Sequence, residues 1–177
     1  MTPKRFKHQG KGLTIRYGCE KCALGWLLIA TTELGLCSVQ LGDDEKPLVT
    51  GLRMDFEQAT LRRDEESLRA CFDAFNAYFE DRKRLPDFPL DVQATAFQVQ
   101  VWQALREIPY GTTMSYSELA RRMDAPNASR AVASACARNP VTITIPCHRI
   151  VPRTGGFGGY RWDPARKKRL LEIERLG

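Results

Sequence analysis

The sequence predicts an α+β protein made of a small N-terminal α/β domain with an antiparallel sheet and a C-terminal domain that is mostly helical. Strand-like runs are confined to residues 13–41. A charged stretch with two prolines, residues 81–89, breaks the helical periodicity and is typical of a linker. Helical spacing returns at residue 96 without further strands. We therefore expect domains at 1–90 and 91–177.

The N-terminal domain contains three expected strands and two expected helices. The strands are the runs Leu13–Tyr17, Trp26–Thr31 and Leu36–Leu41, which glycine-containing turns separate. Apolar residues at helical spacing predict helices at Lys46–Phe56 and Glu65–Phe79. The combination of these strands and helices makes this an α/β domain, and we expect it to have a structural role.

The C-terminal domain contains a candidate helix-turn-helix. A helix is expected over 96–108, followed by a turn. Ser115 and Glu118 have the spacing of a capping box and open a short second helix. After a turn, Asn127 is expected to cap a third helix over 128–138. The order helix, tight turn, helix is common in DNA-binding domains.

Net charge is concentrated in the same domain. Residues 1–90 hold 14 basic and 14 acidic side chains, whereas residues 91–177 hold 13 and 7 and so supply the whole net charge of +6. A basic domain of this size commonly binds nucleic acid, although a solvated basic face is the plainer alternative. The cluster Arg166 to Arg169 is read as such a solvated face.

Other features restrict the location and the partners. Apolar stretches are shorter than the roughly 20 residues of a membrane span, and the start of the chain has no apolar secretion segment, so we expect a cytoplasmic protein without a membrane partner. The six cysteines are scattered rather than spaced as a disulfide scaffold and are expected to be reduced. Cys19 and Cys22 suggest zinc, but a structural site needs four ligands, and the possible additions, His8 and Cys37, are distant.

The third helix is unusually poor in side-chain bulk. Alanine and serine dominate it, and Arg130 stands near its start. A smooth helix can approach a DNA groove closely without reading its sequence, but small residues equally allow tight packing in a core. Both interpretations remain open on this evidence.

The most informative segment is Pro146-Cys147-His148-Arg149-Ile150, which follows an apolar run. A cysteine beside a histidine can be held as a thiolate, which is the nucleophilic form. The segment resembles the active-site motif of the O6-alkylguanine-DNA alkyltransferases. Other matches are the capping-box helix with Tyr116, the alanine-rich helix led by Arg130, the run Arg138-Asn139-Pro140-Val141 and the run Gly159-Tyr160-Arg161-Trp162. Residues 35–44 resemble the C-terminal domain of the Ada-type members in particular.

This resemblance implies a ribonuclease H-like N-terminal domain, a winged helix-turn-helix-like C-terminal domain and a set of catalytic roles. Cys147 would accept the alkyl group, and His148 would take the thiol proton through a water. Glu174 would orient the histidine, with Glu172 as the rival because spacing alone does not choose between them. Tyr116 would donate a hydrogen bond to the base and help to rotate the nucleotide outward.

The resemblance also implies a DNA-contacting helix and a base pocket. Arg130 would fill the stack where the base has left, on a surface that includes Ala131, Ser134 and Ala135. Asn139 would be a hinge, or equally the C-cap of the helix. Trp162 would stand at the pocket mouth and admit methyl groups better than benzyl groups. The expected pocket residues are Asn139, Pro146, Ile150, Tyr160, Arg161 and Trp162.

The resemblance therefore implies a monomer that binds duplex DNA containing O6-alkylguanine, or O4-methylthymine, and repairs one lesion per molecule without a metal or other cofactor. The chain is expected to be either a free-standing enzyme or part of a longer one. Two alternatives stay open: a helix-turn-helix DNA-binding or regulatory protein without chemistry, and a cysteine hydrolase. Stoichiometry separates the three classes: an alkyltransferase is consumed by its own reaction, a DNA-binding protein without chemistry never reacts, and a hydrolase turns over.

Overall fold

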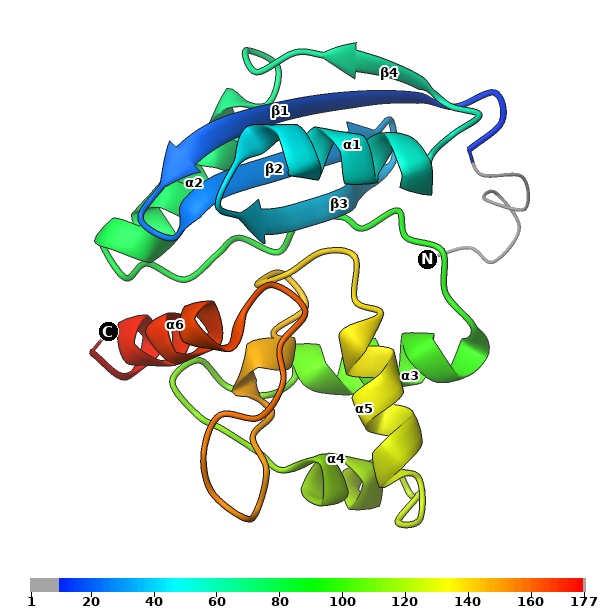
Figure 1. The fold of residues 1–177 in the computed structure, drawn as a ribbon. Helices are drawn as coiled ribbons and strands as arrows, with labels where there is room; N and C mark the ends of the chain where they lie inside the picture. The colour runs from blue at the N-terminus through cyan, green and yellow to red at the C-terminus, as the bar shows by residue number, and fades with distance from the viewer. Residues whose placement is uncertain (1–9, 177) are drawn as a thin grey trace. The chain divides into compact units, whose positions relative to one another are not determined.

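The computed structural model describes residues 10–176, which form two compact units, one ending at Ala94 and one beginning at Thr95 (Figure 1). The first unit contains a four-stranded sheet of order β3-β2-β1-β4. The three expected strands are present, and β1 to β3 are antiparallel neighbours. Their bounds are β1 Thr14–Cys22, β2 Gly25–Thr32 and β3 Gly35–Gly42.

The sheet is mixed rather than wholly antiparallel, because a fourth strand, β4 (Thr60–Arg63), pairs parallel with β1. Sequence reasoning missed this strand. Only Leu61 among its four residues is apolar, and the others are exposed, so it lacks the alternation that identifies a half-buried strand. The backbone pairing with β1 holds it in place instead.

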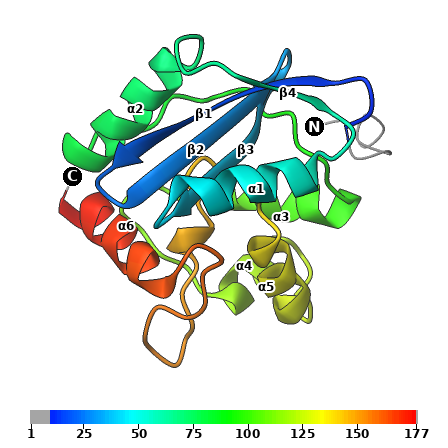
Figure 2. The ribbon, with the colours of Figure 1, turned by 45° about the horizontal axis from the view of Figure 1, so that its top comes forward.

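Two helices cover opposite faces of this sheet. Helix α1 (Glu45–Asp55) contacts β2 and β3 and buries Leu48 and Leu52 against one face (Figures 1 and 2). Helix α2 (Arg69–Glu80) packs on the other face, where Phe72 approaches Gly18 of β1 so closely that a β-carbon there would lie 3.0 Å from its ring. Successive strand residues point to opposite faces, so both faces of the sheet are buried.

The end of the expected linker runs along the edge strand β3. Leu36 donates its N–H to the Pro89 carbonyl at 2.9 Å, and Asp91 donates its N–H to the Leu36 carbonyl at 2.8 Å. Gly35 has a φ of +147° and no room for a side chain, since a β-carbon would lie 2.2 Å from the Pro89 oxygen. The linker therefore satisfies part of the exposed edge of the sheet.

The second unit is helical, as expected. The expected capping box of Ser115 with Glu118 is present at α4, and Thr95 with Gln98 forms a second box at α3 that was not predicted. The prediction that Asn127 caps the next helix is wrong, because Ala128 is the N-cap residue and no side chain caps that helix. The elements are α3 Ala96–Arg106, α4 Tyr116–Arg122, α5 Ser129–Ala137, the short 3-10 helix η1 Cys147–Arg149 and α6 Pro164–Leu176.

Helices α3, α4 and α5 pack against one another around a common core. Trp102 of α3 is 1% exposed and donates its Nε1–H to the Ala135 carbonyl of α5 at 3.0 Å, which joins the two helices by a buried hydrogen bond. The pair α4 and α5 forms the helix-turn-helix. Within residues 10–176, no helix has the length and apolar character needed to cross a membrane.

Candidate active site

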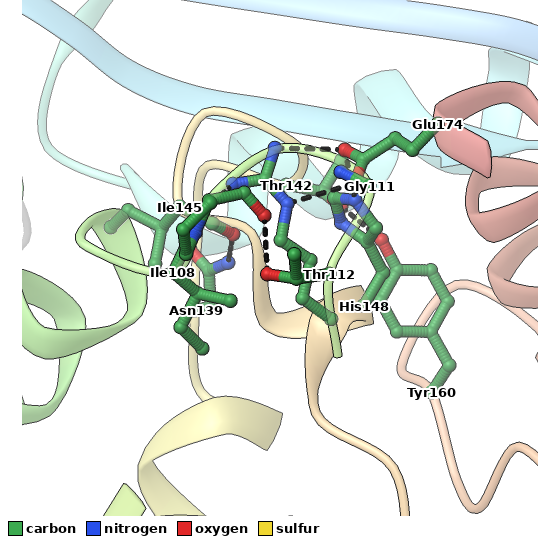
Figure 3. A network of polar contacts seen from close by, with 11 residues as sticks. Ile108, Gly111, Thr112, Asn139, Thr142, Ile145, His148, Tyr160 and Glu174 are labelled. Atoms are coloured by element: carbon green, nitrogen blue, oxygen red, sulfur yellow. Dashed lines mark hydrogen bonds and ion pairs between the residues drawn. The ribbon is translucent and has the colours of Figure 1, made fainter. Parts of the chain in front are cut away.

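Asn139 organises the loop that connects α5 to Cys147. Its side chain is fully buried, and its Oδ1 accepts the Val141 N–H at 3.0 Å. Its Nδ2 donates to the Ile145 carbonyl at 2.8 Å and to Cys147 Sγ at 3.2 Å (Figure 3). The helix itself ends two residues earlier, with Arg138 as its C-cap, so Asn139 acts as a clasp across the loop rather than as the cap.

Cys147 lies at the start of η1 and is only 5% exposed. Burial raises the pKa of its thiol to about 11, although the hydrogen bond from Asn139 and the positive charge of Lys167 oppose that shift. Near neutral pH a thiol with this pKa keeps its proton and does not rest as a thiolate. Any reaction at this sulfur requires a base that removes the proton as the new bond forms.

His148 and Glu174 form a buried pair behind this thiol. The two side chains have no exposed surface, and His148 Nε2 lies 2.9 Å from Glu174 Oε1. Glu172, the rival carboxylate, lies instead on a more exposed side of α6 and pairs with Arg169 at 3.3 Å. The geometry thus brings Glu174, and not Glu172, to the histidine.

The protonation states in this pair follow from burial and charge. Burial lowers the pKa of His148, although its contact with Glu174 works in the opposite direction. Burial alone would raise the pKa of Glu174, but hydrogen bonds from His148 and Arg149 outweigh it, and the pKa falls well below the ordinary range. A charged carboxylate only accepts, so Nε2 carries the imidazole proton. Nδ1 is buried with no partner among residues 10–176 and remains a proton acceptor.

Arg149 and Gly111 complete the surroundings of Glu174. Arg149 Nε and Nη2 bind the two carboxylate oxygens at 2.9 and 2.8 Å. The Gly111 N–H donates to Oε2 at 3.2 Å (Figure 3). Gly111 has a φ of +75°, and a β-carbon there would lie 2.9 Å from the Glu174 carbonyl oxygen. Only glycine permits this approach.

A cavity of about 310 Å³ opens at Cys147. Four of the predicted site residues line it: Tyr116, Cys147, Tyr160 and Arg161. The lining is completed by Ala133, Cys136, Ala137 and Gly159.

The other predicted pocket residues are not part of this lining. Asn139, Pro146 and Ile150 are buried. Trp162 is 6% exposed and packs edge-on against Tyr160, with ring centroids 5.3 Å apart at 64°. The Tyr160 hydroxyl in turn hydrogen-bonds Thr142 Oγ1 at 2.5 Å (Figure 3). Trp162 is therefore packed against Tyr160 and is not one of the residues that line the cavity.

Helix α5 places most of the expected DNA-contacting residues outward. Arg130 and Ala131 are exposed, and Ser134 is half-buried with its hydroxyl accepting Arg138 Nη1 at 2.7 Å. Ala135 is only 2% exposed and faces the core, where its carbonyl accepts the Trp102 indole. We therefore leave Ala135 out of the surface that could meet a partner.

Lys167 was missed by sequence reasoning. It was expected on a solvated face, but it is 1% exposed, and its Nζ donates to the Gly159 carbonyl at 3.4 Å. Burial lowers the pKa of this ammonium. A signal existed in the spacing, because residues 167, 170, 171 and 174 recur at helical period and include the buried Glu174.

Cys19 and Cys22 are not gathered with other possible metal ligands within the described residues. Cys19 belongs to the core beneath α1, whereas Cys22 is half-buried at the end of the same strand. Residues 10–176 contain no group of three or more histidine, cysteine, aspartate or glutamate side chains that could hold a metal ion. His8, the other suggested ligand, lies outside the described residues.

Comparison with known proteins defines the class first. Residues 15–92 match the family model for the ribonuclease-like domain of 6-O-methylguanine DNA methyltransferase, and residues 96–176 match the model for its DNA-binding domain. A solved structure of Mycobacterium tuberculosis O6-methylguanine methyltransferase superposes with a TM-score of 0.77 at 34% identity, covering 92% of this chain and 93% of that one.

Individual relatives identify the family. The inducible methylated-DNA–protein-cysteine methyltransferase of Bacillus subtilis is 39% identical over 150 residues, which is 83% of each chain. The bifunctional transcriptional activator/DNA repair enzyme Ada of Escherichia coli is 44% identical over 174 residues, 98% of this chain but 49% of that protein. The chain thus spans about half the length of the Ada-type relatives it matches. It belongs to the methylated-DNA–protein-cysteine methyltransferase family.

Proposed function

We propose that this protein repairs alkylated DNA by direct reversal, moving the methyl group from O6 of guanine in duplex DNA to Cys147 in a single irreversible step. O4-methylthymine is a second proposed substrate. The proposal rests on Cys147, which lines a cavity of about 310 Å³, and on the buried pair of His148, the next residue in the chain, with Glu174. A nucleophile, a base and a group that orients the base are the parts that such a transfer needs.

The chemistry follows from the protonation states. The Cys147 thiol gives its proton, through a water, to Nδ1 of His148, while Glu174 holds the Nε2–H and stabilises the imidazolium that forms. The sulfur attacks the alkyl carbon, a carbon–sulfur bond forms and the carbon–O6 bond breaks. Guanine leaves as an anion that Tyr116 stabilises as the proposed hydrogen-bond donor to the base. The imidazolium of His148 then releases the proton that it took and guanine gains one, so the net change is that one proton passes from the thiol to guanine and the alkyl group moves to sulfur.

DNA engagement is assigned to the helix-turn-helix. Helix α5 offers small side chains that allow close approach to a groove, and its exposed Arg130 can occupy the space that a flipped base leaves. The Mycobacterium tuberculosis relative has also been solved in complex with DNA. We also propose that the protein acts as a monomer. Because the proposed substrate is cellular DNA, we propose the cytoplasm as its location.

The stiff wall of the cavity favours small alkyl groups. Tyr160 is held by Thr142 at its hydroxyl and by Trp162 at its ring, so it cannot move aside without losing both contacts. We therefore propose that methyl groups react faster than benzyl groups. A Trp162→Gly variant should gain reactivity with O6-benzylguanine, and an unchanged rate would contradict this reading.

The test is a transfer experiment with a duplex that carries one labelled O6-methylguanine. The proposal predicts one equivalent of label per protein chain, located on Cys147 by peptide mapping and abolished in Cys147→Ser. Cys136→Ser is the matched control, because Cys136 is a second buried thiol that lines the same cavity, and it should still accept the label. Release of the methyl group with turnover would indicate a hydrolase, and duplex binding without transfer would indicate a DNA-binding protein.

A further inference from the structure

Glu174 receives more hydrogen bonds than orienting a histidine requires. Oε1 accepts from His148 Nε2 at 2.9 Å and from Arg149 Nη2 at 2.8 Å. Oε2 accepts from Arg149 Nε at 2.9 Å and from the Gly111 N–H at 3.2 Å. The carboxylate has no exposed surface, and the Arg149 side chain is 12% exposed. Both oxygens are therefore held by a two-pronged guanidinium away from bulk water.

The guanidinium is itself fixed from a third direction. Arg149 Nη1 donates to the Ile108 carbonyl at 2.6 Å, just beyond the end of α3. Its central carbon lies 5.7 Å from the centre of the Tyr110 ring. A planar fork with three bonded nitrogens and a stacked face has one orientation, and lysine cannot reproduce it. Arg149 thus joins α3, η1 and α6 at the residue that follows the histidine.

We propose that Arg149 is a positioning residue of the transfer reaction: by occupying both oxygens of Glu174, it confines that carboxylate to orienting His148 through Nε2–H and leaves Nδ1 as the proton acceptor. The inference rests on the proposed function. Without the fork, a buried carboxylate that keeps its contact with the histidine would favour a fully protonated imidazole. An imidazolium already holds a proton at Nδ1 and cannot take one from the thiol.

The charges around His148 give the direction of the effect. Glu174 and Lys167 act on it from α6, and Arg149 acts from η1. Glu174 favours the imidazolium, whereas the two cations disfavour it. Removal of Arg149 leaves one carboxylate against one cation, so the pKa of His148 should rise, by about one to three units for a charge at this range.

The experiment measures the His148 imidazole directly. The chain has two histidines, so a His8→Gln background leaves one imidazole for nitrogen-15 NMR titration. In the parent, the spectrum should show the Nε2–H tautomer and a neutral ring at pH 7. In Arg149→Met, the titration midpoint should rise by about one to three units. Transfer should then slow by about tenfold for each unit by which that midpoint exceeds the assay pH, and recover at higher pH.

Arg149→Lys and Arg169→Met complete the set. Lysine keeps the cation but cannot bind both oxygens in a fork, so transfer should fall between the parent and Arg149→Met, and the imidazole should lose its single tautomer. If Arg149→Met fails to fold, the Arg149→Lys variant still tests whether Arg149 sets the state of His148. Arg169→Met removes an exposed arginine that pairs with Glu172 on the same helix and should leave titration and transfer unchanged.

An unchanged titration and tautomer in a folded Arg149 variant would overturn the inference, even if its transfer were slower, because Arg149 would then act only on stability. A parent that transfers no methyl group would remove the proposed function instead. In that case the titration would still show whether Arg149 sets the state of His148, so the two failures are distinguishable.

Discussion

Replacement of Asn139 by alanine tests whether the clasp across the Cys147 loop stabilises the second unit. The substitution removes three hydrogen bonds, to the Val141 N–H, the Ile145 carbonyl and Cys147 Sγ. The Val141 N–H is then left buried without a partner, which costs about 1–3 kcal/mol. The Ile145 carbonyl keeps its bond from the Cys147 N–H at 2.8 Å, so the loss of its second bond adds only about 0.5–1.5 kcal/mol. The sum is a loss of about 1.5–4.5 kcal/mol in the free energy of unfolding.

Urea unfolding followed by tryptophan fluorescence measures this loss, because Trp102 and Trp162 are buried in the second unit. Asn127→Ala is the control: Asn127 is exposed in the turn before α5, and its loss should change stability by less than about 0.5 kcal/mol. The same variants can be treated with iodoacetamide. Loss of the Asn139 hydrogen bond should move the pKa of Cys147 further upward and slow its alkylation. An Asn139→Ala protein as stable as the Asn127→Ala control would refute the clasp.

Two further predictions concern charge. Lys167→Met should raise the pKa of the Cys147 thiol and slow its alkylation. The free energy of unfolding should stay unchanged or rise, because a buried cation no longer has to be desolvated. Lys168→Met, at the exposed neighbouring residue, is the control, and lower stability with unchanged thiol reactivity would contradict this prediction. In the folded protein the pKa values of Glu174 and His148 lie below their ordinary values of 4.5 and 6.5. The unfolded chain therefore binds more protons than the folded one in acid. As a result, the free energy of unfolding should fall as the pH drops below 6.5, and fall again below 4.5. Urea midpoints from pH 7 to 4 measure this, and a flat profile would argue against the buried pair.

Most of the fold could be predicted because its elements bury regular apolar patterns. Strands β1 to β3 and helices α1 to α3 follow the expected apolar periods, and the capping box at Ser115 marks the start of α4. The strand Thr60–Arg63 could not be found in this way, since its position depends on backbone bonds to β1 and not on buried side chains. The start of α5 could not be predicted either, because its N-cap residue, Ala128, has no capping side chain.

The site was harder to predict because its properties arise from residues far apart in the sequence. Cys147 and His148 are neighbours in the motif, but the choice of Glu174 over Glu172 depends on which face of α6 is buried. The protonated state of the thiol is a consequence of burial, which a five-residue motif does not encode. Arg149 was part of that motif, yet its partners Ile108 and Glu174 lie 41 residues before it and 25 residues after it.

The burial of Cys147 has a consequence for the life of the protein in the cell. Under the proposed function each molecule reacts once, so any thiol lost to an unrelated electrophile or oxidant removes a repair event. A cysteine that is 5% exposed and protonated at neutral pH reacts slowly with small diffusing reagents, because the thiolate is the reactive form. The protein can therefore persist in an unreactive state. An alkyl group bound in the cavity beside the sulfur can react with it, whereas freely diffusing reagents reach it poorly.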